Sequence, residues 1–190
     1  MNKNTQKAEE KKNVFATVNE EKLDTVAGGK IKDREGKEWW EYALDVVHGV
    51  SKGLGHCFTG ESTVSTPEGT KPIKDIKPGD EVLSLDKDGN IRTGKVVKVI
   101  EPAEMPVVEV TFTDGRKWNT TATQWFYCGG DDYACVLDAG DKKALTLDGK
   151  KIGVKTAVET GRKEMVYDFI VDDLNVMFIN GVCAEGFSVD

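Results

Sequence analysis

One cysteine stands where it could cut its own chain. Cys57 follows a glycine-rich segment, 53–56, and opens a stretch rich in short apolar runs and turn residues. Its thiol can reach the carbonyl carbon of His56 through a five-membered ring, which would convert the 56–57 peptide bond into a thioester. Water or an external thiol could then cleave that thioester. The alternative is that Cys57 is a small buried core residue.

The residues that follow are those of a β domain. Val107 to Thr113 is largely β-branched and ends in Asp114-Gly115, a hairpin signal. Similar Asp-Gly turns are predicted at 88–89 and 148–149, and short strand-like runs at 96–100 and 166–171. Many short strands separated by tight turns predict an all-β domain.

Three stretches in this region resemble the Hint superfamily, the fold shared by inteins, bacterial intein-like domains and Hedgehog autoprocessing domains. They are Cys57 to Asp86, Val107 to Cys128 and Val166 to Gly186, in the family's order. The resemblance covers Cys57 to Asp190. It implies a Hint-like horseshoe of short strands in an all-β fold, preceded here by an N-terminal leader helix and a short amphipathic helix.

The resemblance also implies the site residues. Besides Cys57 they are Thr121, Gln124 and Asp168. Gln124 replaces the histidine of the family's Thr-x-x-His motif. Asp168 lies where family members often carry a catalytic aspartate, which could tune the thiol or accept its proton. Glutamine donates hydrogen bonds but cannot transfer a proton near neutral pH, and general acid help is typically worth about 10²–10⁴-fold. A large loss of rate is therefore expected. The alternatives are a strand residue at 121, a structural donor or relic at 124 and a turn residue at 168.

The C-terminal end departs from the family as well. Hint domains that splice usually close with a His-Asn pair, and the matching residues here are Glu185 and Gly186. We therefore expect cleavage without splicing. Asn180-Gly181 is interpreted as a turn dipeptide rather than as a replacement for the cyclising asparagine.

Residues 1–29 resemble a double-glycine leader of bacteriocin-type peptides. Apolar residues lie on one face of a predicted helix that ends at Gly28-Gly29, where the leader would be cut. The resemblance implies recognition by the papain-like leader peptidase domain of an ABC exporter, through the residues Phe15, Val18, Leu23 and Val26. The alternative is a short helix that packs on the β domain.

Residues 30–56 form a separate short segment. Trp39 and Trp40 begin a run of apolar residues at helical spacing, while its basic and acidic residues balance. The segment resembles the amphipathic core of small exported peptides with an unidentified receptor or membrane target. The alternative is a linker helix that docks its tryptophans on the β domain.

The composition of the chain argues against several classes of binding partner. A net charge of −7 and a pI near 5.0 argue against nucleic-acid binding. No metal-ligand spacing and no nucleotide or phosphate motif occurs, so neither metal nor cofactor is expected. The four cysteines are Cys57, Cys128, Cys135 and Cys183; Cys128 and Cys135 would form a disulfide in an exported chain or remain single buried thiols.

The sequence thus predicts a precursor of three parts, with a leader at 1–29, a short peptide or linker at 30–56 and a Hint-like domain at 57–190. The main hypothesis is Cys57-dependent cleavage of the 56–57 bond in a chain made in a bacterial cytoplasm and then exported. The alternative is a catalytically degenerate Hint-like domain that serves as exported cargo or binding module. A third, weaker hypothesis is a secreted effector that binds a surface through Trp39 and Trp40.

Overall fold

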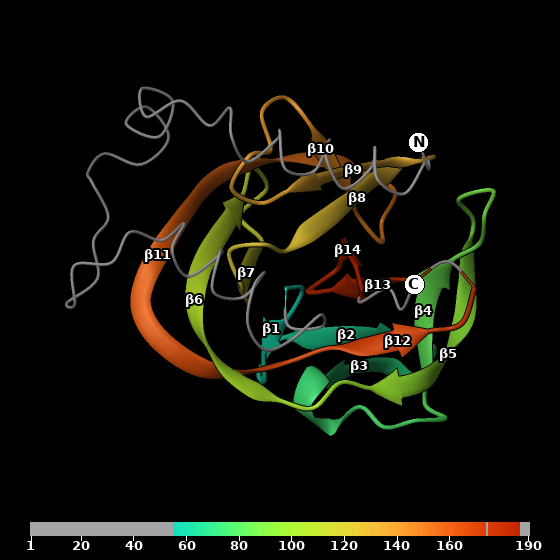
Figure 1. Ribbon diagram of the computed structural model, residues 1–190. Coiled ribbons are helices and arrows are strands. Elements are labelled where there is room, and N and C mark those ends of the chain that lie inside the picture. Colours follow the sequence, from blue (N-terminus) through green and yellow to red (C-terminus); the bar gives the residue numbers. More distant parts are fainter. Residues whose placement is uncertain (1–54, 174, 187–190) are drawn as a thin grey trace, which may run out of the picture. The chain divides into compact units, whose positions relative to one another are not determined.

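Strands make up almost all of the regular structure between residues 55 and 186 (Figure 1). The structure is a computed structural model that describes residues 55–173 and 175–186. Within them only a short 3-10 helix, η1 (Ile73–Asp75), interrupts the strands, so the predicted all-β class is confirmed. The strands are β1 (Phe58–Thr59), β2 (Thr63–Thr66), β3 (Gly69–Pro72), β4 (Glu81–Leu85), β5 (Ile91–Val99), β6 (Ala103–Phe112), β7 (Lys117–Thr120), β8 (Trp125–Gly129), β9 (Asp132–Cys135), β10 (Lys143–Leu145), β11 (Lys151–Tyr167), β12 (Phe169–Val171), β13 (Val176–Ile179) and β14 (Val182–Glu185).

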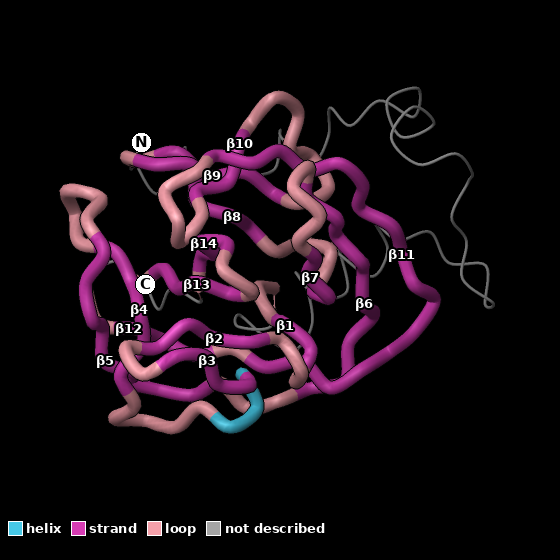
Figure 2. Tube along the Cα trace, turned by 180° about the vertical axis from the view of Figure 1, so that it is seen from behind, coloured by secondary structure: helices cyan, strands magenta, loops and turns pink. Residues whose placement is uncertain are grey.

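The strands form three sheets. Their orders are β1-β7-β6-β11-β10, β12-β5-β4 and β3-β2-β13-β14-β8-β9. The long antiparallel ribbon of β6 and β11 curves side by side along one flank in both views (Figures 1 and 2). Two register shifts, between Val154 and Thr156 and between Glu159 and Lys163, interrupt this ribbon, as expected of bulges that bend a strand pair.

The predicted turns are confirmed. The Asp-Gly pairs at 88–89, 114–115 and 148–149 each lie in a hairpin loop. Gly89, Gly115 and Gly149 have φ angles of 81°, 91° and 77°. Glycine reaches this left-handed region without the steric cost of a Cβ atom, which is why these dipeptides mark the turns in the sequence.

Trp118 joins two of the sheets. It is fully buried on β7, and its ring makes edge-to-face contacts with Phe58 and Phe112, each at a centroid distance of 5.0 Å. Its indole N–H donates a hydrogen bond of 2.7 Å to the carbonyl of Ile179 on β13. Because β13 belongs to the six-stranded sheet, this single side chain ties that sheet to the strand that precedes the candidate site.

The strand-like run at 166–171 is in fact two strands. β11 ends at Tyr167 and β12 begins at Phe169, and the two belong to different sheets. Asp168 lies at the break, where its own Oδ1 accepts the N–H of Phe169 at 2.7 Å and its carbonyl accepts the N–H of Ile100 at 2.9 Å. The chain therefore changes sheets at the predicted catalytic aspartate.

Several predictions fall outside these residues. The proposed leader at 1–29 and all of segment 30–56 except Gly55 and His56 lie outside the described ranges, so the domain boundaries stay predictions. In the part of the chain that is described, no helix has the length and apolar character needed to cross a membrane.

Candidate functional site

Cys57 is buried at the entry to β1, with both of its main-chain polar groups held by the end of β7. Its N–H donates to the hydroxyl of Thr121 at 3.2 Å. Its carbonyl accepts the hydroxyl hydrogen of Thr120 at 2.6 Å and the N–H of Thr121 at 3.1 Å. The nitrogen that would leave in a cleavage of the 56–57 bond is therefore fixed against one predicted site residue.

The chain upstream of the bond is fixed as well. The carbonyl of Gly55 accepts the hydroxyl of Thr121 at 3.0 Å and also the hydroxyl of Thr123. The Thr121 hydroxyl thus accepts from the leaving nitrogen and donates to the carbonyl two residues earlier. In this arrangement its hydrogen is already directed to Gly55, and an oxyanion forming on the carbonyl of His56 would need other donors.

The Cys57 thiol is held in its neutral form. Burial raises its pKa well above the ordinary value, and the negative charge of Asp168 raises it further. A hydrogen bond with the His56 backbone works in the opposite direction and only partly offsets these effects. Because the thiolate is the nucleophile, attack requires a nearby base to take the thiol proton.

Asp168 is the carboxylate whose negative charge raises the pKa of that thiol. It is 1% exposed at the junction of β11 and β12, and its charge acts directly on Cys57. The structure therefore brings Cys57, Thr121 and Asp168 together from three separate parts of the sequence. That position suits a base and also a hydrogen-bonding turn residue, the two roles foreseen for residue 168.

Gln124 is placed differently. Its side chain is fully buried, and its amide nitrogen donates to the carbonyls of Trp125 at 2.8 Å and Glu185 at 2.9 Å. Both amide hydrogens are thereby used on main-chain oxygens, which favours the structural-donor interpretation over an acid substitute. The Oε1 atom of Gln124 receives no hydrogen bond within the described residues.

Sequence reasoning gave no role to Glu185, which reaches the site from the end of β14. One carboxylate oxygen, Oε2, lies 3.7 Å from Nδ1 of His56, with the two side chains 29% and 25% exposed. Thr120 and Thr123 were likewise missed, although the cluster of hydroxyls around Thr121 is visible in the sequence. No local pattern pointed to the pair of Glu185 and His56.

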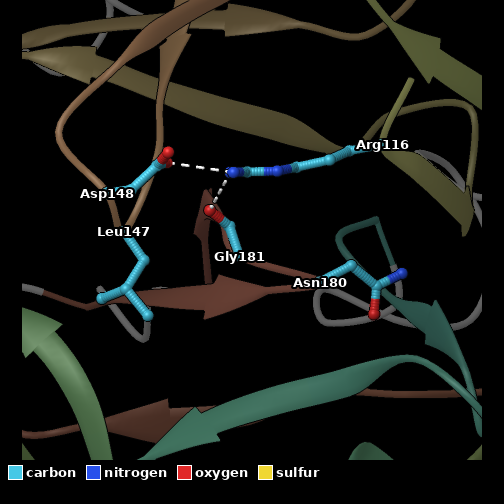
Figure 3. A pocket seen from close by; sticks show the side chains of 5 residues that line it. All are labelled: Arg116, Leu147, Asp148, Asn180 and Gly181. Atoms are coloured by element: carbon cyan, nitrogen blue, oxygen red, sulfur yellow. Dashed lines mark hydrogen bonds and ion pairs between the residues drawn. The ribbon is translucent and has the colours of Figure 1, made fainter. Parts of the chain in front are cut away.

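A hollow lies elsewhere on the domain (Figure 3). It has a volume of about 400 Å³ and is lined by Arg116, Leu147, Asp148, Asn180 and Gly181. The guanidinium of Arg116 donates to the Gly181 carbonyl at 2.9 Å and to Asp148 at 3.0 Å. Its charge is therefore already paired with a carboxylate, and the hollow contains no predicted site residue.

Asn180 is a turn residue, as interpreted from the sequence. Its φ angle is 50°, and its Oδ1 accepts both the N–H and the hydroxyl of Thr63, at 2.8 and 2.9 Å. Its amide nitrogen donates to the carbonyl of Lys117 at 2.8 Å. A side chain held by three hydrogen bonds at a β-hairpin is poorly placed for cyclisation.

The four cysteines, all of which the structure describes, are free thiols. In the β8–β9 hairpin Cys135 pairs with Trp125 rather than with Cys128, so that register does not support a disulfide between them. Within residues 55–173 and 175–186 no group of three or more histidine, cysteine or acidic side chains could hold a metal ion.

Comparison with known proteins finds similarity to the Hint module and to hedgehog proteins. The family model of the Hint module matches residues 46–127. The Sonic hedgehog protein of Danio rerio is 30% identical over 134 residues, which is 62% of this chain and 32% of that protein. The chain spans about a third or less of the length of the curated relatives it matches.

Solved structures show the same fold. The Ssp DnaB mini-intein variant M86 superimposes with a TM-score of 0.64 at 19% identity, covering 70% of this chain and 95% of the intein. A bacterial intein-like domain from Clostridium thermocellum has a TM-score of 0.58 at 22% identity, covering 69% and 99%. Together with the match to the Hint module over residues 46–127, these structures show that the described β domain has the fold of inteins and intein-like domains.

Proposed function

We propose that this Hint-fold chain is a self-processing precursor in which Cys57 breaks the 56–57 peptide bond without splicing. The observation that carries the proposal is the hydrogen bond of 3.2 Å between the Cys57 nitrogen and the Thr121 hydroxyl, next to a buried thiol under the charge of Asp168. Nucleophile, leaving nitrogen and a candidate base are thereby gathered around one peptide bond.

The first step is an N–S acyl shift. As Sγ of Cys57 bonds to the carbonyl carbon of His56, the thiol proton passes to the carboxylate of Asp168, and the bond from that carbon to the Cys57 nitrogen breaks. The nitrogen takes up one proton and becomes a free amine. The hydrogen bonds to Gly55 and to the main chain of Cys57 keep both sides of the bond in register during the attack.

The second step releases the segment ahead of Cys57. Water or an external thiol attacks the carbonyl carbon of the thioester, and the sulfur of Cys57 leaves and regains a proton. The products are residues 1–56, ending in a carboxylate or a new thioester, and a domain that begins at Cys57. Without the family's histidine at position 124 we expect slow turnover, in line with the typical 10²–10⁴-fold worth of general acid catalysis.

The released segment is proposed to be an exported peptide. The chain would be made in a bacterial cytoplasm, and an ABC exporter with a papain-like peptidase would recognise Phe15, Val18, Leu23 and Val26 and cut after Gly29. The support is the resemblance of 1–29 to double-glycine leaders. Because a folded β domain should not thread an exporter, cleavage at Cys57 would come first and leave 30–56 to meet its receptor or membrane target.

The test is intact mass spectrometry of purified full-length protein with and without dithiothreitol. We expect a fragment that ends at His56, formed faster with the thiol and absent from a Cys57→Ala variant. If the wild-type chain gives no Cys57-dependent fragment even with added thiol, the proposal is wrong.

A degenerate scaffold is the second candidate function. It is favoured by the amide of Gln124, whose hydrogens both bind main-chain carbonyls. In this case the domain would serve as exported cargo or as a binding module. A silent wild type that cleaves as Gln124→His would identify an intact scaffold that lacks only its proton donor.

A further inference from the structure

The residues after Cys57 contain no histidine, yet an imidazole lies at the candidate site. We infer that Glu185 is a positioning residue that holds the His56 imidazole as the proton donor for the 56–57 bond, so that the segment to be released supplies its own acid. This inference rests on the proposed cleavage at Cys57. It also makes histidine before Cys57 a requirement of the substrate sequence.

The first argument is the distance. Nδ1 of His56 lies 3.7 Å from Oε2 of Glu185, within the range of an ion pair. A carboxylate at this distance stabilises the charged imidazolium. The His56 and Glu185 side chains are 25% and 29% exposed, whereas the Nδ1 atom itself is buried, so water screens this charge contact only in part.

The second argument is that both partners are held. His56 sits between two anchors, the Gly55 carbonyl bound by two threonine hydroxyls and the Cys57 N–H bound by Thr121. Glu185 is paired with Val176 across the β13–β14 hairpin. Its carbonyl also accepts the amide of Gln124 at 2.9 Å.

The contact between Glu185 and His56 explains together the two positions, 124 and 185, at which the family's histidines are replaced. Gln124 replaces the expected histidine and holds the strand end that carries Glu185. Glu185, in the place of the second expected histidine, faces His56. The imidazole that the domain lacks is thereby provided from the substrate side of the bond.

The proton balance is simple. As the bond between the His56 carbonyl carbon and the Cys57 nitrogen breaks, the imidazolium gives one proton to that nitrogen. The thiol proton stays on the buried Asp168 until the thioester is cleaved and then returns to the Cys57 sulfur, while the partly exposed imidazole regains its proton from solvent. Only two covalent bonds separate the Cα atom of His56 from the nitrogen to be protonated, which limits how far the imidazole can lie from that nitrogen.

The ionisable groups named around the site are neutral or negative, so none of them repels a positive charge on the imidazole. On β9, Tyr133 has a pKa raised to about 12, first by burial and then by the charge of Glu185, so it stays neutral near pH 7. On the Cys57 side the thiol is neutral and the charge of Asp168 is negative. The carboxylate of Glu185, 3.7 Å from Nδ1, favours the protonated ring over the neutral one.

The contact can be tested without any cleavage. In full-length Cys57→Ala protein, the ring resonances of the two histidines are followed by NMR against pH, with His48→Gln used for assignment. Adding Glu185→Gln should move the His56 midpoint to lower pH by roughly half a unit or more, the size expected of one charge about 4 Å away in water. Adding Glu68→Gln, on an exposed turn, should move nothing. An unchanged midpoint in Glu185→Gln would overturn the positioning role.

Cleavage rates then test the acid. With dithiothreitol, His56→Gln should be slower by about 10²–10⁴-fold, and Glu185→Gln should shift the high-pH decline of the rate to lower pH. If the wild type cleaves through Cys57 but His56→Gln matches its rate and pH profile, the inference is wrong and the proposed function stands. A wild type that never cleaves overturns the proposed function instead, and the NMR midpoint still decides whether Glu185 holds the ring.

Discussion

Replacing Thr121 by valine should separate the residue that touches the leaving nitrogen from the residues that only hold the chain. Valine keeps the β-branched shape but removes the hydroxyl, and with it the bonds to the Cys57 N–H at 3.2 Å and the Gly55 carbonyl at 3.0 Å. Gly55 retains its second donor, Thr123. The loss therefore falls mainly on the buried nitrogen of Cys57.

The expected size follows from these contacts. A buried donor left without its acceptor costs about 1–3 kcal/mol, so Thr121→Val should lower the free energy of unfolding by that amount. Just before the C–N bond breaks, the Cys57 nitrogen has taken up its proton and carries a positive charge, and hydrogen bonds to charged groups are worth roughly 1–1.5 kcal/mol more than those between neutral groups. Since about 1.4 kcal/mol is a factor of ten, we expect cleavage about tenfold slower than in the wild type.

Thr123→Val is the matched control. It removes one of two donors to Gly55 and leaves the Cys57 nitrogen untouched, so it should cost under about 1 kcal/mol of stability and leave the rate within about threefold. Urea unfolding measures the first quantity and dithiothreitol-induced cleavage, followed by intact mass, the second. Equal rates for Thr121→Val and wild type, or a slower Thr123→Val, would refute the assignment of Thr121 to the leaving nitrogen.

Three further predictions concern stability, each measured by urea unfolding. Trp118→Phe should cost roughly 2–4 kcal/mol, because it opens a cavity and leaves a β13 carbonyl without its indole donor; a cost below about 1 kcal/mol would contradict its role in joining the sheets. Above pH 9 stability should fall by up to about 1.4 kcal/mol per pH unit and buried thiol, because burial raises the pKa of Cys57, Cys128, Cys135 and Cys183 above 9.0 and these thiols ionise first in the unfolded chain; replacing Cys57 and Cys183 by serine should make this slope shallower, and an unchanged slope would contradict the burial of these two thiols. Gly94→Ala should cost about 1–3 kcal/mol, because its Cβ would lie 2.4 Å from a β12 methyl carbon, whereas Gly153→Ala, with its nearest neighbour at 3.5 Å, should be tolerated.

The fold could be predicted where local chemistry decides the backbone. The Asp-Gly hairpins at 88–89, 114–115 and 148–149 were found because only glycine takes the required φ without strain. The strand break at Asp168 could not be found in this way. Its apolar neighbours continue without interruption, and the change of sheet is set by distant partners on β5 and β6.

The site residues also fall into two groups, those that lie in short sequence motifs and those that only the fold brings together. Cys57, Thr121 and Asp168 lie in short motifs, so a resemblance to known domains was enough to select them. Glu185 and His56 belong to no common motif and meet only through the pairing of β14 in the six-stranded sheet. Gln124 could be recognised as a substitution, but its two main-chain partners depend on where β8 and β14 meet.

The position of the imidazole has a consequence for the reaction as a whole. If the acid is His56, it leaves with the released segment, and the domain that begins at Cys57 retains no histidine. The amine of the new terminus could then attack a returning acyl group only without that proton carrier, so the products would not readily rejoin. A domain with its own histidine keeps its catalyst after cleavage, whereas in this chain one turnover would remove the proton donor together with the product.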